Sequence, residues 1–431
     1  MTSKPHVVAI LPQLMPSTTL TVVKPLLGLY KTGHITADIA LEGYASARHL
    51  DEADVFVFSR NSDPAYRSFL EAVIACRKPF IYDIDDNLFE LPAAYRPTQV
   101  QDVEARQELF SEYLRAASLV QVYSRPMLER VQALNPRAVL TDALIDWGLI
   151  PTSPPRRDPE RVRVVYATSR VQHDELAGLF LEDIRKILSL YPHSVELYCW
   201  GYHPPELRDL PTVRFLKYID NYDKFFHRFA RAGFDIGLAP LRDEIFYRSK
   251  TNNKFREYAA CRIAGVYSNV EVYGSCVEHE RSGLLVANVP GAWFDAIARL
   301  IGDQILRARI QEQAFSYVQR RYSVEKTQQQ WLTRLLQVLQ SGRTDTDGAE
   351  HAGSPARTSP AVMLSPSLPS RPDSRGTLPG ALRLVVQRLL RFVRGVQEGG
   401  LKVGSHKIRW TIQTFRNVLR LKWLLLRAAW R

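Results

Sequence analysis

The fold is first indicated by residues 53–84, ADVFVFSRNSDPAYRSFLEAVIACRKPFIYDI. Two short apolar segments, Ala53–Ser59 and Pro79–Ile84, flank a stretch of helical length, Ala65–Cys76. Short apolar runs without alternation are typical of strands that are buried on both faces. The stretch between them predicts a crossover helix. Residues 53–84 therefore predict a strand–helix–strand unit of a parallel sheet.

The same alternation extends through the rest of the chain. Further strands are predicted at 6–11, 119–123, 163–167, 195–199, 213–216, 235–239, 264–268 and 283–286. Further helices are predicted at 19–31, 103–117, 174–190, 223–231, 253–262, 292–301, 303–320 and after Ser323. Residues 151–159 hold four prolines and interrupt the pattern. We therefore expect an α/β protein with two Rossmann-like, doubly wound domains, 1–150 and 160–340, that face a cleft.

Composition and charge divide the chain further. A chain of 431 residues is too long to fold around one compact core. A composition of 45% hydrophobic and 24% charged residues excludes wholesale disorder and a polytopic membrane protein. The net charge is +12, of which residues 381–431 contribute +11. Residues 342–380 are rich in Ser, Pro, Gly and Thr and predict a flexible linker.

The tail after this linker combines positive charge with apolar faces. Basic side chains such as Arg383, Arg391 and Arg394 recur at helical spacing, with Leu, Phe and Val on another side. This pattern predicts amphipathic helices within 381–431 that bind an anionic membrane surface. Packing of these helices on the protein or on a partner is an alternative. Nucleic acid is not expected as a partner, since phosphate contacts need no apolar face.

Cysteine usage and the N-terminus suggest where the protein resides. Cys76, Cys199, Cys261 and Cys276 are scattered and fit no metal-ligand spacing, as in proteins of a reducing compartment. The N-terminal apolar stretch is too short for a signal peptide. We expect a cytoplasmic protein that lies peripherally on the inner face of the membrane. The sequence contains no Gly-x-Gly-x-x-Gly, Walker, His-Glu-x-x-His or Gly-x-Ser-x-Gly motif.

The second half contains an ordered series of motifs. They are Asp235-Ile-Gly-Leu-Ala-Pro240, Lys250-Thr-Asn-Asn-Lys254-Phe-Arg-Glu257-Tyr-Ala-Ala260, Gly265-Val-Tyr-Ser268, Val277-Glu-His279 and Ser282-Gly-Leu-Leu-Val286. The series resembles the donor-binding half of GT-B glycosyltransferases of the family-four-like type (group 1), found in bacterial surface-polysaccharide synthesis. The resemblance covers about residues 5–340 and is strongest over 235–286. It implies a nucleotide-sugar donor, a retaining reaction and no metal or other cofactor.

Three side chains carry the expected donor chemistry. Lys250 and Lys254 lie four residues apart and share one face if the helix extends back to Lys250. Their ammonium groups would neutralise the departing diphosphate, and Glu257 would accept hydrogen bonds from ribose hydroxyls. By the resemblance, Glu257 is the second of two acids, and Ser249 stands where the first is expected. The alternative is a solvated helix face with ordinary ion pairs.

Two further groups are candidates for the site. Arg170 and His173 follow the strand 163–167, where the resemblance places a loop that faces the phosphates; His173 and Asp174 could instead begin a helix. Asp83, Asp85 and Asp86 follow the strand 79–84 and are expected on the acceptor side or lining the cleft. Metal binding and turn capping are the alternatives for these aspartates. No general base and no other catalytic residue is assigned.

Together these features predict a glycosyltransferase that moves a sugar from a nucleotide-sugar to a glycan or lipid-linked acceptor in cell-surface polysaccharide synthesis. The alternative is a GT-B-like scaffold of weak activity that recruits partners at the membrane. Ser249 favours this alternative, as do Arg262, Ala264 and Glu280, which stand where the family has Gly, Pro and Gly.

Overall fold

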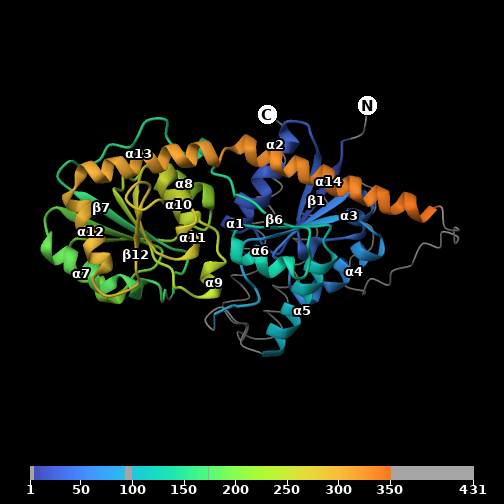
Figure 1. Cartoon of the computed structure of the whole chain (residues 1–431), viewed down its shortest axis with the longest axis horizontal. Helices are drawn as coiled ribbons and strands as arrows, with labels where there is room; N and C mark the ends of the chain where they lie inside the picture. Colours follow the sequence, from blue (N-terminus) through green and yellow to red (C-terminus); the bar gives the residue numbers. More distant parts are fainter. Residues whose placement is uncertain (1–3, 93–99, 173, 351–431) are drawn as a thin grey trace, which may run out of the picture.

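The computed structural model of the chain describes residues 4–92, 100–172 and 174–350. They form two domains side by side, each built on a six-stranded parallel sheet with helices on both faces (Figure 1). The strand orders are β2-β1-β3-β4-β5-β6 and β12-β11-β10-β7-β8-β9. The predicted fold class, two Rossmann-like doubly wound domains, is confirmed.

The first sheet contains β1 (His6–Leu11), β2 (Thr36–Leu41), β3 (Val55–Ser59), β4 (Phe80–Ile84), β5 (Leu119–Val122) and β6 (Ala138–Leu140). The second contains β7 (Val162–Ala167), β8 (Val195–Trp200), β9 (Val213–Leu216), β10 (Ile236–Ala239), β11 (Ala264–Ser268) and β12 (Leu284–Val286).

The helices of the first half are α1 (Pro16–Thr18), α2 (Lys24–Lys31), α3 (Ala47–Glu52), α4 (Arg67–Ala75), α5 (Val100–Ala116) and α6 (Arg125–Gln132). A π-helical turn, Thr19–Val23, joins α1 to α2. The helices that follow are α7 (Leu181–Leu190), α8 (Tyr222–Phe229), α9 (Ile245–Arg248), α10 (Asn253–Ala260), α11 (Glu271–Gly274), α12 (Ala292–Gly302), α13 (Gln304–Arg321) and α14 (Val324–Glu350).

Alternation of side chains along the central strands builds a core on each face of a sheet. On β1, Val7 and Ala9 pack into the cluster beneath α2, whereas Val8 and Ile10 pack with Phe56 on the opposite face. These five side chains are at most 1% exposed. The strand is apolar at every position because both faces are covered.

Three differences from the predicted elements have local causes. The strands β2 and β6 were missed: β2 is an edge strand with only two fully buried positions, and β6 has three residues, so neither carries a clear apolar run. The predicted helix 174–190 begins only at Leu181 as α7. Asp174 is a turn residue instead, because its Oδ1 accepts a hydrogen bond from the backbone N–H of Leu176 at 3.1 Å.

The helix predicted after Ser323 crosses back to the first domain. In Figure 1, α14 continues from α13 above the second domain and runs along the first. Trp331, Leu335 and Val338 are at most 2% exposed and pack into the same cluster as α2. The indole Nε1 of Trp331 donates to the backbone oxygen of Thr21 at 3.0 Å. The helix ends at Glu350, inside the stretch 342–380 predicted as a linker.

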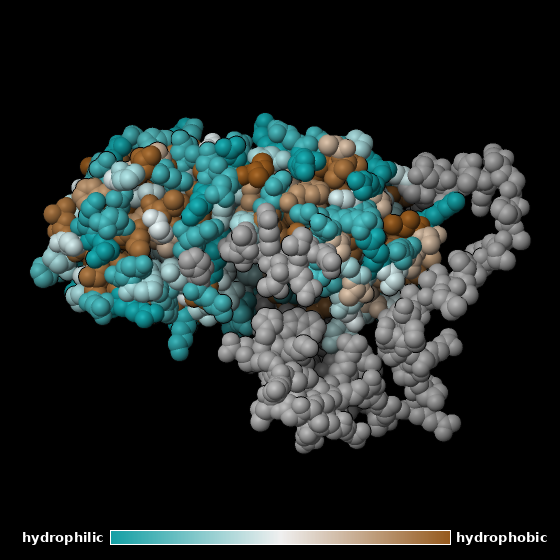
Figure 2. All heavy atoms as spheres, turned by 90° about the horizontal axis from the view of Figure 1, so that it is seen from below, coloured by the Kyte–Doolittle hydropathy of each residue, from teal (hydrophilic) through white to brown (hydrophobic). Residues whose placement is uncertain are grey.

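The described surface is mainly hydrophilic on the face shown in Figure 2, where apolar side chains form small patches between polar ones. None of the described helices has the length and apolar character needed to cross a membrane. The predicted amphipathic helices of 381–431 lie outside the described residues.

Truncating the tryptophan of α14 tests whether this helix holds the first domain together. Trp331→Ala removes a buried indole and its hydrogen bond, and we expect a loss of about 3–5 kcal/mol in the free energy of unfolding, measured by urea denaturation. Leu336→Ala is the matched control, because Leu336 is 43% exposed on the same helix, and it should change stability by less than about 0.5 kcal/mol. Equal effects of the two substitutions would contradict the packing described.

Candidate functional site

The strand orders bring two topological switch points to the domain interface. In the first sheet the order reverses between β1 and β3, and in the second between β7 and β10. Ligands of doubly wound sheets bind outside the carboxyl ends of the strands at such points. In the first domain, Ser17 lies in α1 after β1, Arg60 follows β3, Asp83 lies in β4, and Asp85 and Asp86 follow β4. In the second domain, Arg170 follows β7, and Lys250 lies after β10, between α9 and α10.

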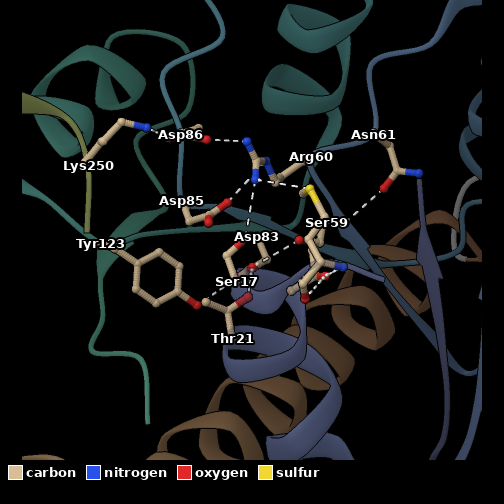
Figure 3. A network of polar contacts seen from close by, with 12 residues as sticks. Ser17, Thr21, Ser59, Arg60, Asn61, Asp83, Asp85, Asp86, Tyr123 and Lys250 are labelled. Carbon is tan, nitrogen blue, oxygen red and sulfur yellow. Dashed lines mark hydrogen bonds and ion pairs between the residues drawn. The ribbon is translucent and has the colours of Figure 1, made fainter. Parts of the chain in front are cut away.

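Asp83 lies at the end of β4 and is completely buried (Figure 3). Its carboxylate accepts hydrogen bonds from Thr21 Oγ1 at 2.9 Å, Ser59 Oγ at 3.3 Å, Gln121 Nε2 at 3.3 Å and Tyr123 Oη at 2.6 Å. Burial, together with the nearby charge of Asp85, raises the pKa of Asp83 to about 7 despite these donors. All the donors belong to the first domain, so Asp83 joins the π-helical turn Thr19–Val23 to β3 and to the end of β5 rather than facing the second domain.

Asp85 and Asp86 share one guanidinium. Arg60 Nε lies 3.3 Å from Asp85 Oδ1, and Arg60 Nη2 donates to Asp86 Oδ2 (Figure 3). Arg60 Nη1 also donates to Ser17 Oγ at 3.3 Å. Arg60 follows β3 with a φ of 62°, a left-handed conformation that is rare outside glycine. The contacts of the guanidinium with Ser17, Asp85 and Asp86 offset the cost of this strained backbone.

Lys250 extends this cluster across the domain interface. Its Nζ lies 2.7 Å from Asp86 Oδ1 and 4.2 Å from the centre of the Phe246 ring. Burial opposes ionisation of Asp86, but the charges of Lys250 and Arg60 outweigh it and lower the pKa of Asp86 to about 2. Burial raises the pKa of Asp85, with Asp86 contributing. The structure thus brings Asp85, Asp86 and Lys250 together.

Ser249, the residue beside Lys250, is an interdomain contact. It is 2% exposed, its Oγ accepts from Asn87 Nδ2 at 3.2 Å, and its backbone oxygen accepts from Ser124 Oγ at 2.8 Å. Position 249 therefore binds the first domain in this chain, with a neutral hydroxyl where the resemblance leads one to expect an acid.

Lys254 and Glu257 form a second pair in the first turns of α10. Lys254 Nζ lies 2.8 Å from Glu257 Oε2, and Glu257 is 8% exposed. The helix begins at Asn253 and α9 ends at Arg248, so the helix does not extend back to Lys250. The two lysines consequently occupy different local structures: Lys254 lies on the helix with Glu257, and Lys250 lies in the preceding loop with Asp86.

Arg170 lies in the loop after β7 and adds a further positive charge. Its Nη1 is 4.0 Å from Asp174 Oδ2, and its charge also lowers the pKa of Asp86. Arg170 therefore lies near the interdomain cluster, and its contact with phosphate stays a prediction. His173 lies outside the described residues.

Arg256 is a buried cation that sequence reasoning missed. It is 2% exposed, and its Nη1 donates to the backbone oxygens of Ala143 and Leu144 at 2.9 Å each. Its Nε donates to Asn252 Oδ1 at 2.9 Å, and the guanidinium lies 5.6 Å from the centre of the Tyr322 ring. Arg256 thereby joins the loop before α10 to both chain segments that pass between the domains.

Two residues stand where the resemblance leads one to expect glycine, and both have a left-handed backbone. They are Arg262 and Glu280, with φ values of 53° and 62°. Each left-handed residue of this kind costs on the order of 1–2 kcal/mol. Arg262 offsets part of its cost, since its guanidinium lies 3.4 Å from the centre of the Phe315 ring and its Nε lies 3.1 Å from Glu312 Oε2.

Within the described ranges, no group of three or more His, Cys, Asp or Glu side chains is arranged to hold a metal ion. The oxygens of the predicted aspartates face Arg60, Lys250 and hydroxyl groups instead. Arg60 itself carried no recognisable sequence signal, because its role depends on contacts with residues 25 and 26 positions further along the chain.

The comparisons agree with the fold and match most of the second domain to a known family. Residues 162–303 match the family model for glycosyl transferases group 1. No curated protein sequence matches the chain. Sucrose-phosphate synthase from Thermosynechococcus elongatus has a TM-score of 0.60 at 14% identity, covering 78% of this chain and 100% of that chain.

Two other solved structures are similarly related. A glycosyltransferase from Rickettsia africae ESF-5 has a TM-score of 0.56 at 14% identity, covering 78% of this chain and 99% of its own. HepE of Anabaena, solved in complex with UDP-glucose, has a TM-score of 0.54 at 16% identity, covering 77% and 99%. These likenesses concern the two-domain architecture. The chain thus shares its two-domain fold with these structures, and residues 162–303, within its second domain, are similar to glycosyl transferases group 1.

Proposed function

We propose that the protein transfers a sugar from a nucleotide-sugar to a glycan or lipid-linked acceptor in cell-surface polysaccharide synthesis. The observation that carries the proposal is the placement of Lys250, Lys254, Glu257 and Arg170 at the switch point of a group 1 domain. HepE, which shares the fold, was solved with UDP-glucose, which supports a donor of this class.

Each residue has a defined part in the proposed reaction. Lys250, Lys254 and Arg170 stabilise the negative charge that develops on the diphosphate as its bond to the sugar breaks. Glu257 accepts hydrogen bonds from the ribose hydroxyls, and its pair with Lys254 holds both side chains in position. Asp85 and Asp86 reach the interface from the first domain, which is the acceptor side. His173 would join the donor residues through its place in the loop after β7.

Metal independence and retention of the anomeric configuration are parts of the same proposal. Three cations lie near the interface, so the diphosphate would be neutralised without a divalent ion. We expect turnover of the nucleotide-sugar to remain unchanged in the presence of EDTA. We also expect the product to keep the donor's anomeric configuration, observed by NMR. Loss of activity on chelation, or inversion, would contradict the corresponding part.

The donor site is tested by thermal shift of the full-length protein against a panel of nucleotide-sugars. A donor at 100 times its dissociation constant should stabilise the protein by about 2.7 kcal/mol. Lys254→Ala and Glu257→Ala should each weaken donor binding, by roughly ten- to a hundredfold for loss of a charged hydrogen bond. Control substitutions are Glu182→Ala and Arg185→Ala, an exposed pair with the same spacing on α7, which should leave binding unchanged.

The two candidate functions give different results in this system. Donor binding that survives both substitutions in α10 would reject the assigned site. Donor binding without transfer to any glycan or lipid-linked acceptor would favour the scaffold of weak activity.

We also propose that the basic tail, residues 381–431, holds the enzyme on the inner face of the membrane. Each Lys or Arg near an anionic surface contributes about 1 kcal/mol. A chain that ends at Gly380 should fail to sediment with anionic vesicles that bind the full-length protein, and should keep its donor thermal shift. Neutral vesicles are the control and should bind neither chain strongly. Unchanged sedimentation of the shortened chain would reject the anchor.

A further inference from the structure

Asp86 is the carboxylate of the first domain that contacts Lys250 of the second. Asp86 Oδ1 lies 2.7 Å from Lys250 Nζ, and the other oxygen of Asp86 accepts from Arg60 (Figure 3). The side chains of Lys250, Arg60 and Asp86 are 20%, 16% and 18% exposed. Asp86 is therefore a fixed negative charge at the cation that the proposed function assigns to the departing diphosphate.

The cluster has little spare positive charge. Its cations are Arg60, Lys250 and Arg170, and the acids in contact with them are Asp85, Asp86 and Asp174. Arg60, Lys250 and Arg170 attract an anion that enters beside Lys250, and the three acids oppose that attraction. Each additional negative charge on the anion is both attracted by the cations and repelled by Asp86, so Asp86 lowers the gain in affinity that the extra charge would otherwise bring.

Donor and product differ by one such charge. In a nucleotide-sugar each phosphate carries one negative charge, because the terminal phosphate is esterified to the sugar. Transfer breaks the bond between the anomeric carbon and the phosphate oxygen, and the electron pair stays on that oxygen. The acceptor hydroxyl forms the new glycosidic bond and loses its proton to solution. The freed terminal phosphate, whose second pKa is about 6, then gains a second charge near neutral pH.

We propose that Asp86 lets the protein distinguish the nucleotide-sugar from the nucleoside diphosphate product by charge, weakening the hold on the product once transfer has occurred. This inference rests on the proposed function. A phosphate oxygen bound to Lys250 at about 2.8 Å would lie within roughly 6 Å of Asp86. At that separation one extra unit charge changes the equilibrium by about tenfold, between the limits set by bulk water and by a partly buried pair.

The test compares two dissociation constants by calorimetry on the full-length protein. The ligands are the nucleotide-sugar with the largest thermal shift in the panel and its own nucleoside diphosphate. Asp86→Asn keeps the shape and the hydrogen-bond acceptor but removes the charge. It should tighten the diphosphate about tenfold more than the nucleotide-sugar. Asp86→Glu keeps the charge and should give a ratio close to that of the unmodified protein.

Two controls separate charge at the site from other effects. Asp209→Asn removes an exposed charge between β8 and β9 and should leave the ratio unchanged. The methyl ester of the terminal phosphate has one charge fewer than the free diphosphate and no sugar, so Asp86→Asn should tighten the free diphosphate about tenfold more than this ester. Asp86→Ser also removes the charge, and it provides the same comparison if Asp86→Asn fails to fold.

The outcomes distinguish the inference from the proposed function. If removal of the charge at position 86 leaves unchanged the affinity for the free diphosphate relative to that for the nucleotide-sugar and the methyl ester, the inference alone is overturned. Failure of every nucleotide-sugar and diphosphate to bind the unmodified protein would overturn the proposed function and the inference with it.

Discussion

One buried guanidinium, that of Arg256, ties the second domain to the segment that connects the two domains. Arg256 is 2% exposed, and a charge removed from water must be compensated by close polar partners. Among the described residues those partners are neutral: backbone oxygens of Ala143 and Leu144, and side chains of the loop before α10. Because the buried guanidinium needs these partners, its hydrogen bonds tie the loop that carries Lys250 to the segment that connects the domains. Arg256 also packs against Tyr322, which lies where the chain passes between the domains for the second time.

On the other side of that loop the interface combines the neutral contacts of Ser249 with the ion pair of Lys250. The pair between Asp86 and Lys250 adds little net stability, because the attraction is offset by the loss of hydration of both charges. Its effect is geometric: Lys250 Nζ and Asp86 Oδ1 lie 2.7 Å apart only while the two carboxyl edges face each other. The hydrogen bonds of Arg256 thus help to fix how the domains are placed. The ion pair of Lys250 with Asp86 forms only in that placement, so the charge environment of the loop depends on it.

Sequence reasoning succeeded where the cause of a structure is local. The central strands were predicted because positions such as Val7, Val8 and Phe56 are buried on both faces and must be apolar. The pairing of Lys254 with Glu257 was accessible in the same way, since residues three apart meet on a helix. The edge strands β2 and β6 were not predicted, because a strand that has a solvated face or only three residues carries no distinctive apolar run. The α14 helix was predicted, but its packing on the first domain follows from contacts that no local pattern records.

The same limit of sequence reasoning applies to the candidate site. The three aspartates were selected as one group, yet the structure gives them different environments: Asp83 is bound by four uncharged side chains of its own domain, whereas Asp86 is bound by two cations. Their pKa values diverge accordingly, to about 7 and about 2. That divergence cannot be read from Asp-Ile-Asp-Asp, because the decisive partner of Asp86 lies 164 residues further along the chain. If Lys250 binds phosphate as proposed, a carboxylate that stays ionised beside it lowers the affinity for anions. On that proposal Asp86 limits how tightly the most charged species on the reaction path is held.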